Sequence, residues 1–217
     1  VLDLCTGGGS LAILAARVFP NAEIEATDLS PDALAVARRN VEEHGLTDRI
    51  RLIEGDLFAG LAAERYDLIL TNPPYVAEAA AAAFPPEYAA EPRLAHVGGA
   101  DGLDIVRRIV REARAHLNPS GALVCELGDG RELFEAAFPD LDALWLDTVE
   151  SEGEVFFAHA EALPAQGGAD RLLGVGDAHR NGGLEGAHVR PTSRTCARRP
   201  RARSRRRPLP AVVRRSR

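Results

Sequence analysis

The stretch that decides the fold lies at the start of the chain, where residues 1–10 read Val-Leu-Asp-Leu-Cys-Thr-Gly-Gly-Gly-Ser. Three of its first four residues are apolar, as is typical of a short buried strand, and a helical spacing of apolar residues begins at Leu11. The glycines between them permit a tight turn and let the backbone approach a ligand at a helix N-terminus. This segment predicts a strand, a ligand-binding turn and a helix. The candidate binding residues of the turn are Cys5, Thr6, Gly7, Gly8 and Gly9.

Strand and helix patterns continue to alternate along the next 150 residues or so. Strands are predicted over residues 1–4, 23–28, 50–54, 66–70, 122–127, 142–149 and 154–159. Helices are predicted after the glycine turn and over residues 31–44, 102–117 and 130–138. This order predicts an α/β fold with a doubly wound, mostly parallel seven-stranded sheet. The last two strands form a terminal antiparallel hairpin, which is expected to place one antiparallel strand at the sheet edge. Ligands of such folds bind at the carboxyl ends of the strands.

Charge divides the chain into two parts. Residues 1–163 hold 12 of the 26 arginines and 29 of the 32 acids, whereas residues 164–217 hold the other 14 arginines and only 3 acids. The first part is predicted to be the folded domain. The second is rich in Gly, Pro, Ser and Arg and predicts a disordered, arginine-rich tail. An acidic domain argues against a surface that binds nucleic acid through its phosphates, so contact with nucleic acid is expected to be indirect only.

Carboxylates follow two of the predicted strands and suggest a nucleoside pocket. Asp28 lies about 20 residues after the glycine turn, where a carboxylate can accept the hydroxyl hydrogens of a ribose. Asp56 and Leu57 follow the third strand and offer an acceptor for an amine and an apolar surface for an adenine ring. Because the set contains no phosphate-binding lysine, it favours S-adenosylmethionine over a nucleotide. The structural alternative is a ligand-free turn with an acid that precedes a helix.

The most specific motif is Asn72-Pro73-Pro74-Tyr75, which follows the fourth predicted strand and cannot continue a sheet. An amide nitrogen is a poor nucleophile, so methyl transfer to it depends on positioning. The Asn72 oxygen and the Pro73 carbonyl can each accept one hydrogen of a planar –NH₂ group and stabilise developing positive charge. Tyr75 can pack on the flat group of the substrate. These four residues are the candidate catalytic residues, and Asn72 is also expected to border the cofactor.

The order of these motifs resembles class I methyltransferases, which have a Rossmann-like fold, over roughly residues 1–160. Within that group the chain resembles the protein-(glutamine amide) methyltransferase family. The elements Pro86-Glu87-Tyr88, Glu91-Pro92 and Gly99-Ala100-Asp101-Gly102-Leu103 look closest to the branch that methylates large-subunit ribosomal protein three. The resemblance implies that the glycine turn, Asp28, Asp56 and Leu57 hold S-adenosylmethionine, while the Asn-Pro-Pro-Tyr loop holds a glutamine amide of a ribosomal protein, with a release factor as second choice.

The chain departs from this family in two ways. Gly8 stands where the family usually has a small polar residue, and a helical amino-terminal recognition domain is expected to be missing. Two other functions remain open: a nucleic-acid methyltransferase that acts on an exocyclic base amine, and a cofactor-binding domain without activity. No spacing suggests a metal site. The three distant cysteines and the absence of a long apolar run predict a cytoplasmic protein without a membrane partner.

Overall fold

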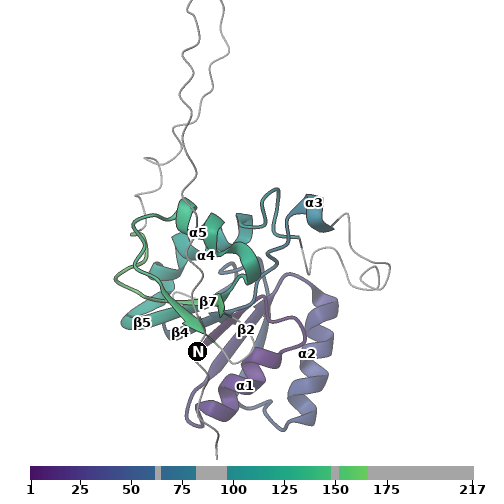
Figure 1. Ribbon diagram of the computed structural model, residues 1–217. Coiled ribbons are helices and arrows are strands. Elements are labelled where there is room, and N and C mark those ends of the chain that lie inside the picture. Colours follow the sequence, from purple (N-terminus) through teal and green to yellow (C-terminus); the bar gives the residue numbers. More distant parts are fainter. Residues whose placement is uncertain (62–64, 82–96, 148–151, 166–217) are drawn as a thin grey trace, which may run out of the picture. The chain divides into compact units, whose positions relative to one another are not determined.

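The computed structural model describes residues 1–61, 65–81, 97–147 and 152–165 (Figure 1). The arginine-rich tail predicted over residues 164–217 therefore lies almost entirely outside the described residues. The motifs Pro86-Glu87-Tyr88 and Glu91-Pro92 lie outside them as well. No helix within the described ranges is long and apolar enough to cross a membrane.

Seven strands form one sheet, in the order β3-β2-β1-β4-β5-β7-β6. Their bounds are β1 Leu2–Leu4, β2 Ile24–Asp28, β3 Ile50–Glu54, β4 Tyr66–Thr71, β5 Leu117–Glu126, β6 Leu144–Asp147 and β7 Glu152–His159. The first five strands pair in parallel, and β7 pairs antiparallel with both β5 and β6. The structure confirms the predicted mostly parallel sheet with a terminal antiparallel hairpin.

The position of the antiparallel strand within the sheet was predicted wrongly. The antiparallel strand β7 lies between β5 and β6 and not at the edge. Phe156 and Ala158 of β7 are buried, and Phe157 on the opposite face is partly buried, as suits an interior strand. The edge strand β6 has only four residues and begins with Leu144, which is 62% exposed. A short, exposed strand is typical of a sheet edge.

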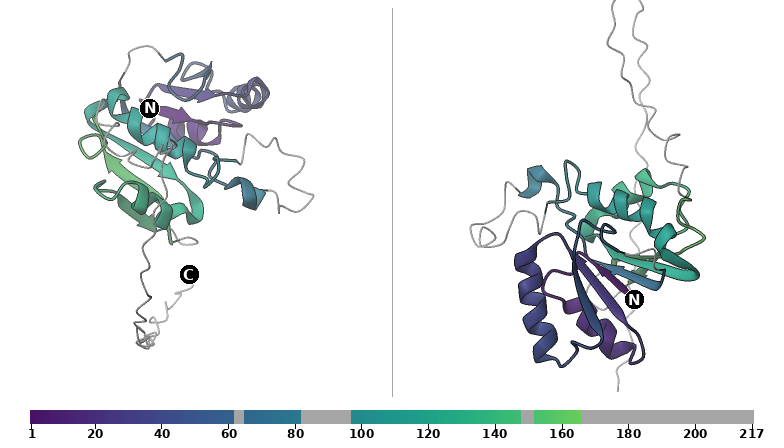
Figure 2. Two further views of the ribbon diagram at one scale, coloured as in Figure 1. Left: turned by 90° about the horizontal axis from the view of Figure 1, so that it is seen from above. Right: turned by 180° about the vertical axis from the view of Figure 1, so that it is seen from behind.

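Five helices are assigned within the described residues: α1 Ser10–Val18, α2 Pro31–Glu43, α3 Glu78–Ala81, α4 Asp104–Ala113 and α5 Arg131–Ala137. Figures 1 and 2 show α1 and α2, in purple and blue, beside the first strands, and the teal α4 beside the later ones. Two separate apolar clusters explain this arrangement. One joins α1 and α2 to β2 and β3, and the other joins α4 and α5 to β1, β4, β5 and β7. Helices therefore cover both faces, as a doubly wound sheet requires.

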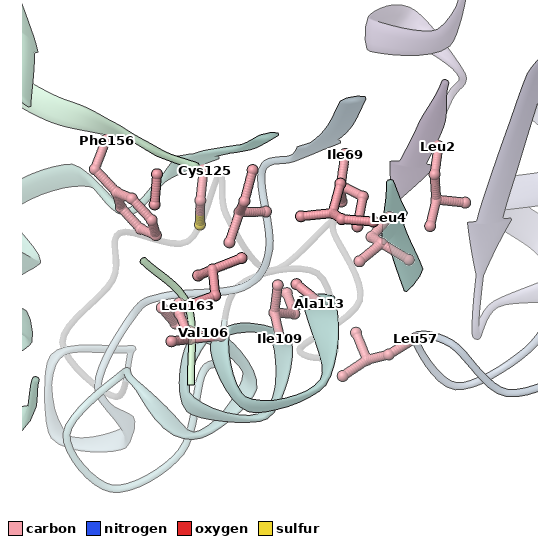
Figure 3. Packing of buried hydrophobic residues seen from close by; sticks show 14 of the residues in the cluster. Leu2, Leu4, Leu57, Ile69, Val106, Ile109, Ala113, Cys125, Phe156 and Leu163 are labelled. Carbon is pink, nitrogen blue, oxygen red and sulfur yellow. The ribbon is translucent and has the colours of Figure 1, made fainter. Parts of the chain in front are cut away.

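Helix α4 shows how the periodicity of the sequence fixes the second cluster. Val106, Ile109 and Ala113 follow a helical spacing and are fully buried. In Figure 3 the Ile109 and Ala113 side chains face the strand residues Leu4 and Ile69, and Val106 lies beside Leu163. Burying each large aliphatic side chain contributes roughly 1.5–3 kcal/mol to folding. The helix ends four residues earlier than predicted, since a 3₁₀ turn covers Arg114–His116 and β5 begins at Leu117.

Candidate active site

The candidate site lies at the carboxyl ends of β2, β1 and β4. In the strand register, Leu4 pairs with Thr27 on one side and with Thr71 on the other. The residues that follow are therefore at one level along the sheet edge, and they are Cys5, Asp28 and Asn72. The chain runs from β1 to β2 in one direction and returns to β4 on the other side of β1. This reversal is the topological switch point at which doubly wound sheets bind ligands.

The glycine turn begins on the residue after β1 and leads directly into α1. Gly7 has a φ of +54° and Gly9 a φ of +83°, both in the left-handed region that favours glycine. A Cβ atom on Gly9 would lie 3.3 Å from the Ala37 Cβ, so this glycine lets α1 begin close to α2. A Cβ atom on Gly7 would meet no atom within 4 Å. The backbone at Gly7 therefore borders open space that a ligand can occupy.

Asp3 supports the turn from beneath and was missed as a site residue by sequence reasoning. It is fully buried, and its Oδ2 accepts hydrogen bonds from the Thr6 hydroxyl at 2.6 Å and from the Ala12 amide at 2.9 Å. Its Oδ1 has no hydrogen-bond partner among the described residues. Burial raises the pKa of Asp3 to about 7, although these two hydrogen bonds lower it. The signal in the sequence was a charged residue, Asp3, between the apolar residues Leu2 and Leu4 of a strand predicted to be buried.

Because the pKa of Asp3 is raised, its contribution to the free energy of unfolding depends on pH. Between about pH 4 and the folded pKa of about 7, the folded state holds a proton that the unfolded state has lost. Stability from this group therefore falls as the pH rises through that window, and the cost is complete above it. We expect Asp3→Asn to gain stability relative to the wild type on going from about pH 4.5 to about pH 8. Urea unfolding at both pH values measures this, and an equal difference at both would contradict it.

Cys5 takes a left-handed conformation, with a φ of 57°, at the exit from β1. Burial, and after it the neighbouring carboxylates of Asp28 and Asp3, raise the pKa of its thiol to about 12. The thiol is therefore protonated at neutral pH and is not an activated nucleophile. Thr6 beside it is buried, and its amide donates to the Thr27 carbonyl at 2.9 Å, which ties the turn to β2.

Asp28 is the partly buried last residue of β2. Its Oδ2 accepts from the Gly7 amide and its Oδ1 from the Ser30 amide, both at 2.8 Å. One hydrogen bond on each oxygen fixes the carboxylate plane and leaves other lone pairs available. The next residue, Leu29, is 56% exposed and is the apolar side chain closest in sequence to this carboxylate. Sequence reasoning missed Leu29, because its exposure could not be judged from the strand pattern.

Asp56 and Leu57 follow β3 but have different environments. Asp56 forms a two-pronged ion pair with Arg108 of α4, at 3.1 and 2.9 Å. Sequence reasoning missed Arg108, since 52 residues separate the partners. Leu57 has a φ of 55° and is only 5% exposed, and Figure 3 places its side chain near α4 in the core. Its apolar surface therefore serves the core, and its carbonyl accepts from the Thr27 hydroxyl at 3.2 Å.

The Asn72–Tyr75 loop leaves the sheet at the end of β4. The hydroxyl of Thr71 donates to the Leu4 carbonyl at 2.9 Å and anchors the loop to β1. Asn72 is exposed, whereas Pro73 is buried and Pro74 half-buried. The Tyr75 hydroxyl donates to a Glu126 carboxylate oxygen at 3.4 Å. Burial and then the charge of Glu126 raise the pKa of Tyr75, so the phenol keeps its proton.

Comparison with known proteins agrees with this geometry. Residues 1–84 match the family model for the methyltransferase small domain. A ribosomal protein uL3 glutamine methyltransferase from Bradyrhizobium diazoefficiens is 63% identical over 163 residues, which are 75% of this chain and 51% of the relative. Proteins of the same name from Bordetella pertussis and Burkholderia pseudomallei are 54% and 53% identical, over 75% and 77% of this chain and 54% and 57% of their own lengths. The chain is a homologue of the uL3 glutamine methyltransferases. It spans about half the length of the curated relatives it matches.

Solved structures show the fold of this homologue. A methyltransferase from Pyrococcus furiosus superposes with a TM-score of 0.54 at 22% identity, over 73% of each chain. TrmN from Thermus thermophilus gives 0.52 at 23% identity, over 73% of this chain and 42% of TrmN. The domain has the class I methyltransferase fold, as predicted. Within the described part of the chain, no three His, Cys, Asp or Glu side chains gather in a group that could hold a metal ion.

Proposed function

We propose that the protein containing this domain transfers a methyl group from S-adenosylmethionine to the side-chain amide nitrogen of a glutamine in a ribosomal protein. Residues 1–163 would form the methyltransferase domain. One observation carries the proposal: the exposed Asn72 stands beside β1 at the switch point, level with Cys5 and Asp28. A loop suited to a planar amine therefore adjoins a turn suited to a nucleoside.

The described residues at the strand ends fit S-adenosylmethionine. Gly7 leaves open space in front of its backbone, Asp28 offers two fixed acceptor oxygens for ribose hydroxyls, and the exposed Leu29 offers an apolar surface for the adenine ring. Asp56, beside Arg108, is the acceptor proposed for the adenine amine. No lysine or arginine occurs within Cys5–Gly9, so a phosphate has no cationic partner in the turn itself. When bound, S-adenosylmethionine supplies an electrophilic methyl group on its sulfonium.

Asp28→Ala is expected to weaken S-adenosylmethionine binding by roughly 1–3 kcal/mol, or about 5- to 150-fold in Kd, because buried ribose hydroxyls lose their acceptor. Isothermal titration calorimetry measures the effect. Asp32→Ala is the matched control, since Asp32 is an exposed acid in the first turn of α2. A Kd for Asp28→Ala equal to that of the control would remove Asp28 from the pocket.

The loop residues orient the acceptor. The Asn72 Oδ1 and the Pro73 carbonyl oxygen accept the two hydrogens of the amide –NH₂, which directs the nitrogen lone pair toward the methyl group. Positive charge develops on that nitrogen during transfer, and both oxygens stabilise it. Tyr75 stays protonated and offers its ring to the flat amide. The N–C bond would form as the S–C bond breaks, leaving a neutral thioether, and the methylated nitrogen would then lose one of its two hydrogens as a proton to solvent.

The choice of a protein acceptor follows from charge. The domain holds 12 arginines against 29 acids, and carboxylates border the loop and the pocket at Asp28, Asp56 and Glu126. Such a surface repels a phosphate backbone, whereas a glutamine in a protein needs no phosphate contact. Relatives at 51–63% identity bear the name ribosomal protein uL3 glutamine methyltransferase, which favours uL3 over a release factor. We also propose a cytoplasmic location, consistent with the free Cys5 and Cys125.

Transfer of radiolabelled methyl from S-adenosylmethionine tests the acceptor class. The intact protein is incubated separately with ribosomal protein uL3, with a release factor, with protein-free ribosomal RNA and with DNA. We expect label on uL3 alone. Label on RNA or DNA that nuclease removes would favour the nucleic-acid methyltransferase, and cofactor binding by calorimetry without transfer to any acceptor would favour a binding domain.

A further inference from the structure

A second segment of the chain, Gly98–Asp104, lies directly against the Asn72–Tyr75 loop. The Gly98 amide donates to the Val76 carbonyl at 2.9 Å, and the Glu78 amide donates to the Gly99 carbonyl at 3.0 Å. A parallel bridge pairs Val76 with Val97. The backbone just after the loop is therefore hydrogen-bonded to a segment more than 20 residues farther along the chain.

The contact leaves no room for side chains. A Cβ atom on Gly98 would lie 2.5 Å from the Pro74 carbonyl oxygen, and one on Gly102 would lie 2.2 Å from the Tyr75 carbonyl oxygen. Both distances are far shorter than a non-bonded carbon–oxygen contact. Gly102 also has a φ of +85°, which favours glycine. These two glycines let the segment touch the backbone of the loop itself.

An ion pair closes this segment. Asp101 receives two hydrogen bonds from the Arg107 guanidinium, at 2.6 and 2.9 Å, and one from the Leu103 amide at 3.0 Å. The Asp104 amide donates to the Gly98 carbonyl at 2.8 Å. This hydrogen bond joins the first residue of α4 to the first residue of the Gly98–Asp104 turn. Arg107 lowers the pKa of Asp101 to about 2, and the carboxylate is therefore charged throughout the neutral range.

We propose that Asp101 and Arg107 are positioning residues for the methyl-acceptor loop, because their ion pair holds the Gly98–Asp104 turn against the backbone of Pro74 and Tyr75. This inference rests on the proposed function. The two residues act through the loop and are assigned no contact with substrate or cofactor. A Cβ atom on Gly128 would lie 2.7 Å from the Tyr75 ring, so a third glycine lies close against the loop.

The kinetic test separates positioning from general stability. In the intact protein, Arg107→Ala and Asp101→Asn are expected to lower kcat for transfer to uL3 by about 10- to 100-fold, since displacements on the order of 1 Å reduce rates on that scale. The Kd for S-adenosylmethionine should stay within about twofold. The Tm should fall only slightly, because ion pairs that remain in contact with solvent contribute little to stability. Arg107→Lys should restore part of the rate.

Glu135→Ala is the control, because it removes another ion pair at the surface, between Glu135 and Arg131 on α5, away from the loop. Its kcat should equal that of the wild type. A wild-type kcat in Arg107→Ala would overturn the proposal, as would a Kd for S-adenosylmethionine that rises in parallel with the fall in kcat.

Gly102→Ala tests the contact from the loop side. The added methyl group is directed at the Tyr75 carbonyl and should lower kcat at least as much as Arg107→Ala. Gly45→Ala is its control, because Gly45 also has a positive φ, of +66°, but no atom lies within 4 Å of its Cβ position. Equal kcat values for the two glycine variants would count against the proposal.

Hydrogen exchange distinguishes failure of this inference from failure of the proposed function. If the wild type methylates no uL3, the proposed function fails. The exchange rates still test whether the Asp101–Arg107 ion pair holds the Gly98–Asp104 turn against the loop. Arg107→Ala should speed exchange at the Gly98 and Glu78 amides by about tenfold or more, whereas the β2 and β3 amides keep their wild-type rates. Unchanged exchange at Gly98 and Glu78 would overturn the inference whatever the activity.

Discussion

Asn72→Ala is expected to lower kcat for methyl transfer by about 10²–10³-fold, the usual range for one lost polar contact to a developing charge. Its side-chain oxygen is proposed to hold the amide nitrogen in line with the methyl group, which matters only in the transition state. The Kd for S-adenosylmethionine should change much less than kcat. Single-turnover kinetics with labelled cofactor, combined with calorimetry, measure both quantities.

Asn118→Ala is the control for Asn72→Ala. Asn118 follows the first residue of β5 and donates to Asp67 near the start of β4, at the opposite end of the sheet. This variant should keep the wild-type kcat. Equal losses of kcat and cofactor affinity in Asn72→Ala would recast Asn72 as mainly a cofactor ligand.

Phe156→Ala is expected to lower the free energy of unfolding by about 3–5 kcal/mol, the usual cost of emptying an aromatic site in a core. Phe156 is fully buried, and its ring centroid lies 4.5 Å from that of Phe134 and 5.8 Å from that of Trp145. This aromatic group joins β7 to α5 and β6. Urea unfolding followed by the fluorescence of Trp145, the chain's one tryptophan, measures the loss.

Phe157→Ala provides the comparison, because Phe157 is the adjacent residue of β7 on the opposite face and is only partly buried. It should destabilise the domain clearly less than Phe156→Ala. Similar losses in the two variants would mean that the aromatic cluster does not carry the stability of the antiparallel end of the sheet.

Local patterns were enough to predict most of the fold. Apolar runs predicted all seven strands, and α2 begins at Pro31 as predicted, where the Ser30 side chain accepts a hydrogen bond from the Ala33 amide. The position of β7 could not be predicted in this way. A hairpin can join a sheet through either of its strands, and no local pattern in the sequence tells which of the two pairs with β5.

For the site, too, local patterns predicted some residues correctly, and contacts between distant residues could not be predicted. Cys5 and Asn72 directly follow β1 and β4, and Asp28 is the last residue of β2, so strand prediction and parallel pairing were sufficient to bring them to one level. Arg108 reaches Asp56 across 52 residues, and no local pattern indicates that contact. Leu57 was expected to offer its side chain to the cofactor, but its left-handed backbone turns that side chain into the core.

The central claim is that the Asn72–Tyr75 loop presents a glutamine amide to the methyl group. Tandem mass spectrometry of uL3, digested after reaction with the intact protein and S-adenosylmethionine, tests it most directly. The account predicts one added methyl group on the side-chain nitrogen of a glutamine, absent from the product of the Asn72→Ala variant. A methyl group on a lysine, an arginine or the main chain, or uL3 left unmodified while RNA becomes labelled, would contradict it.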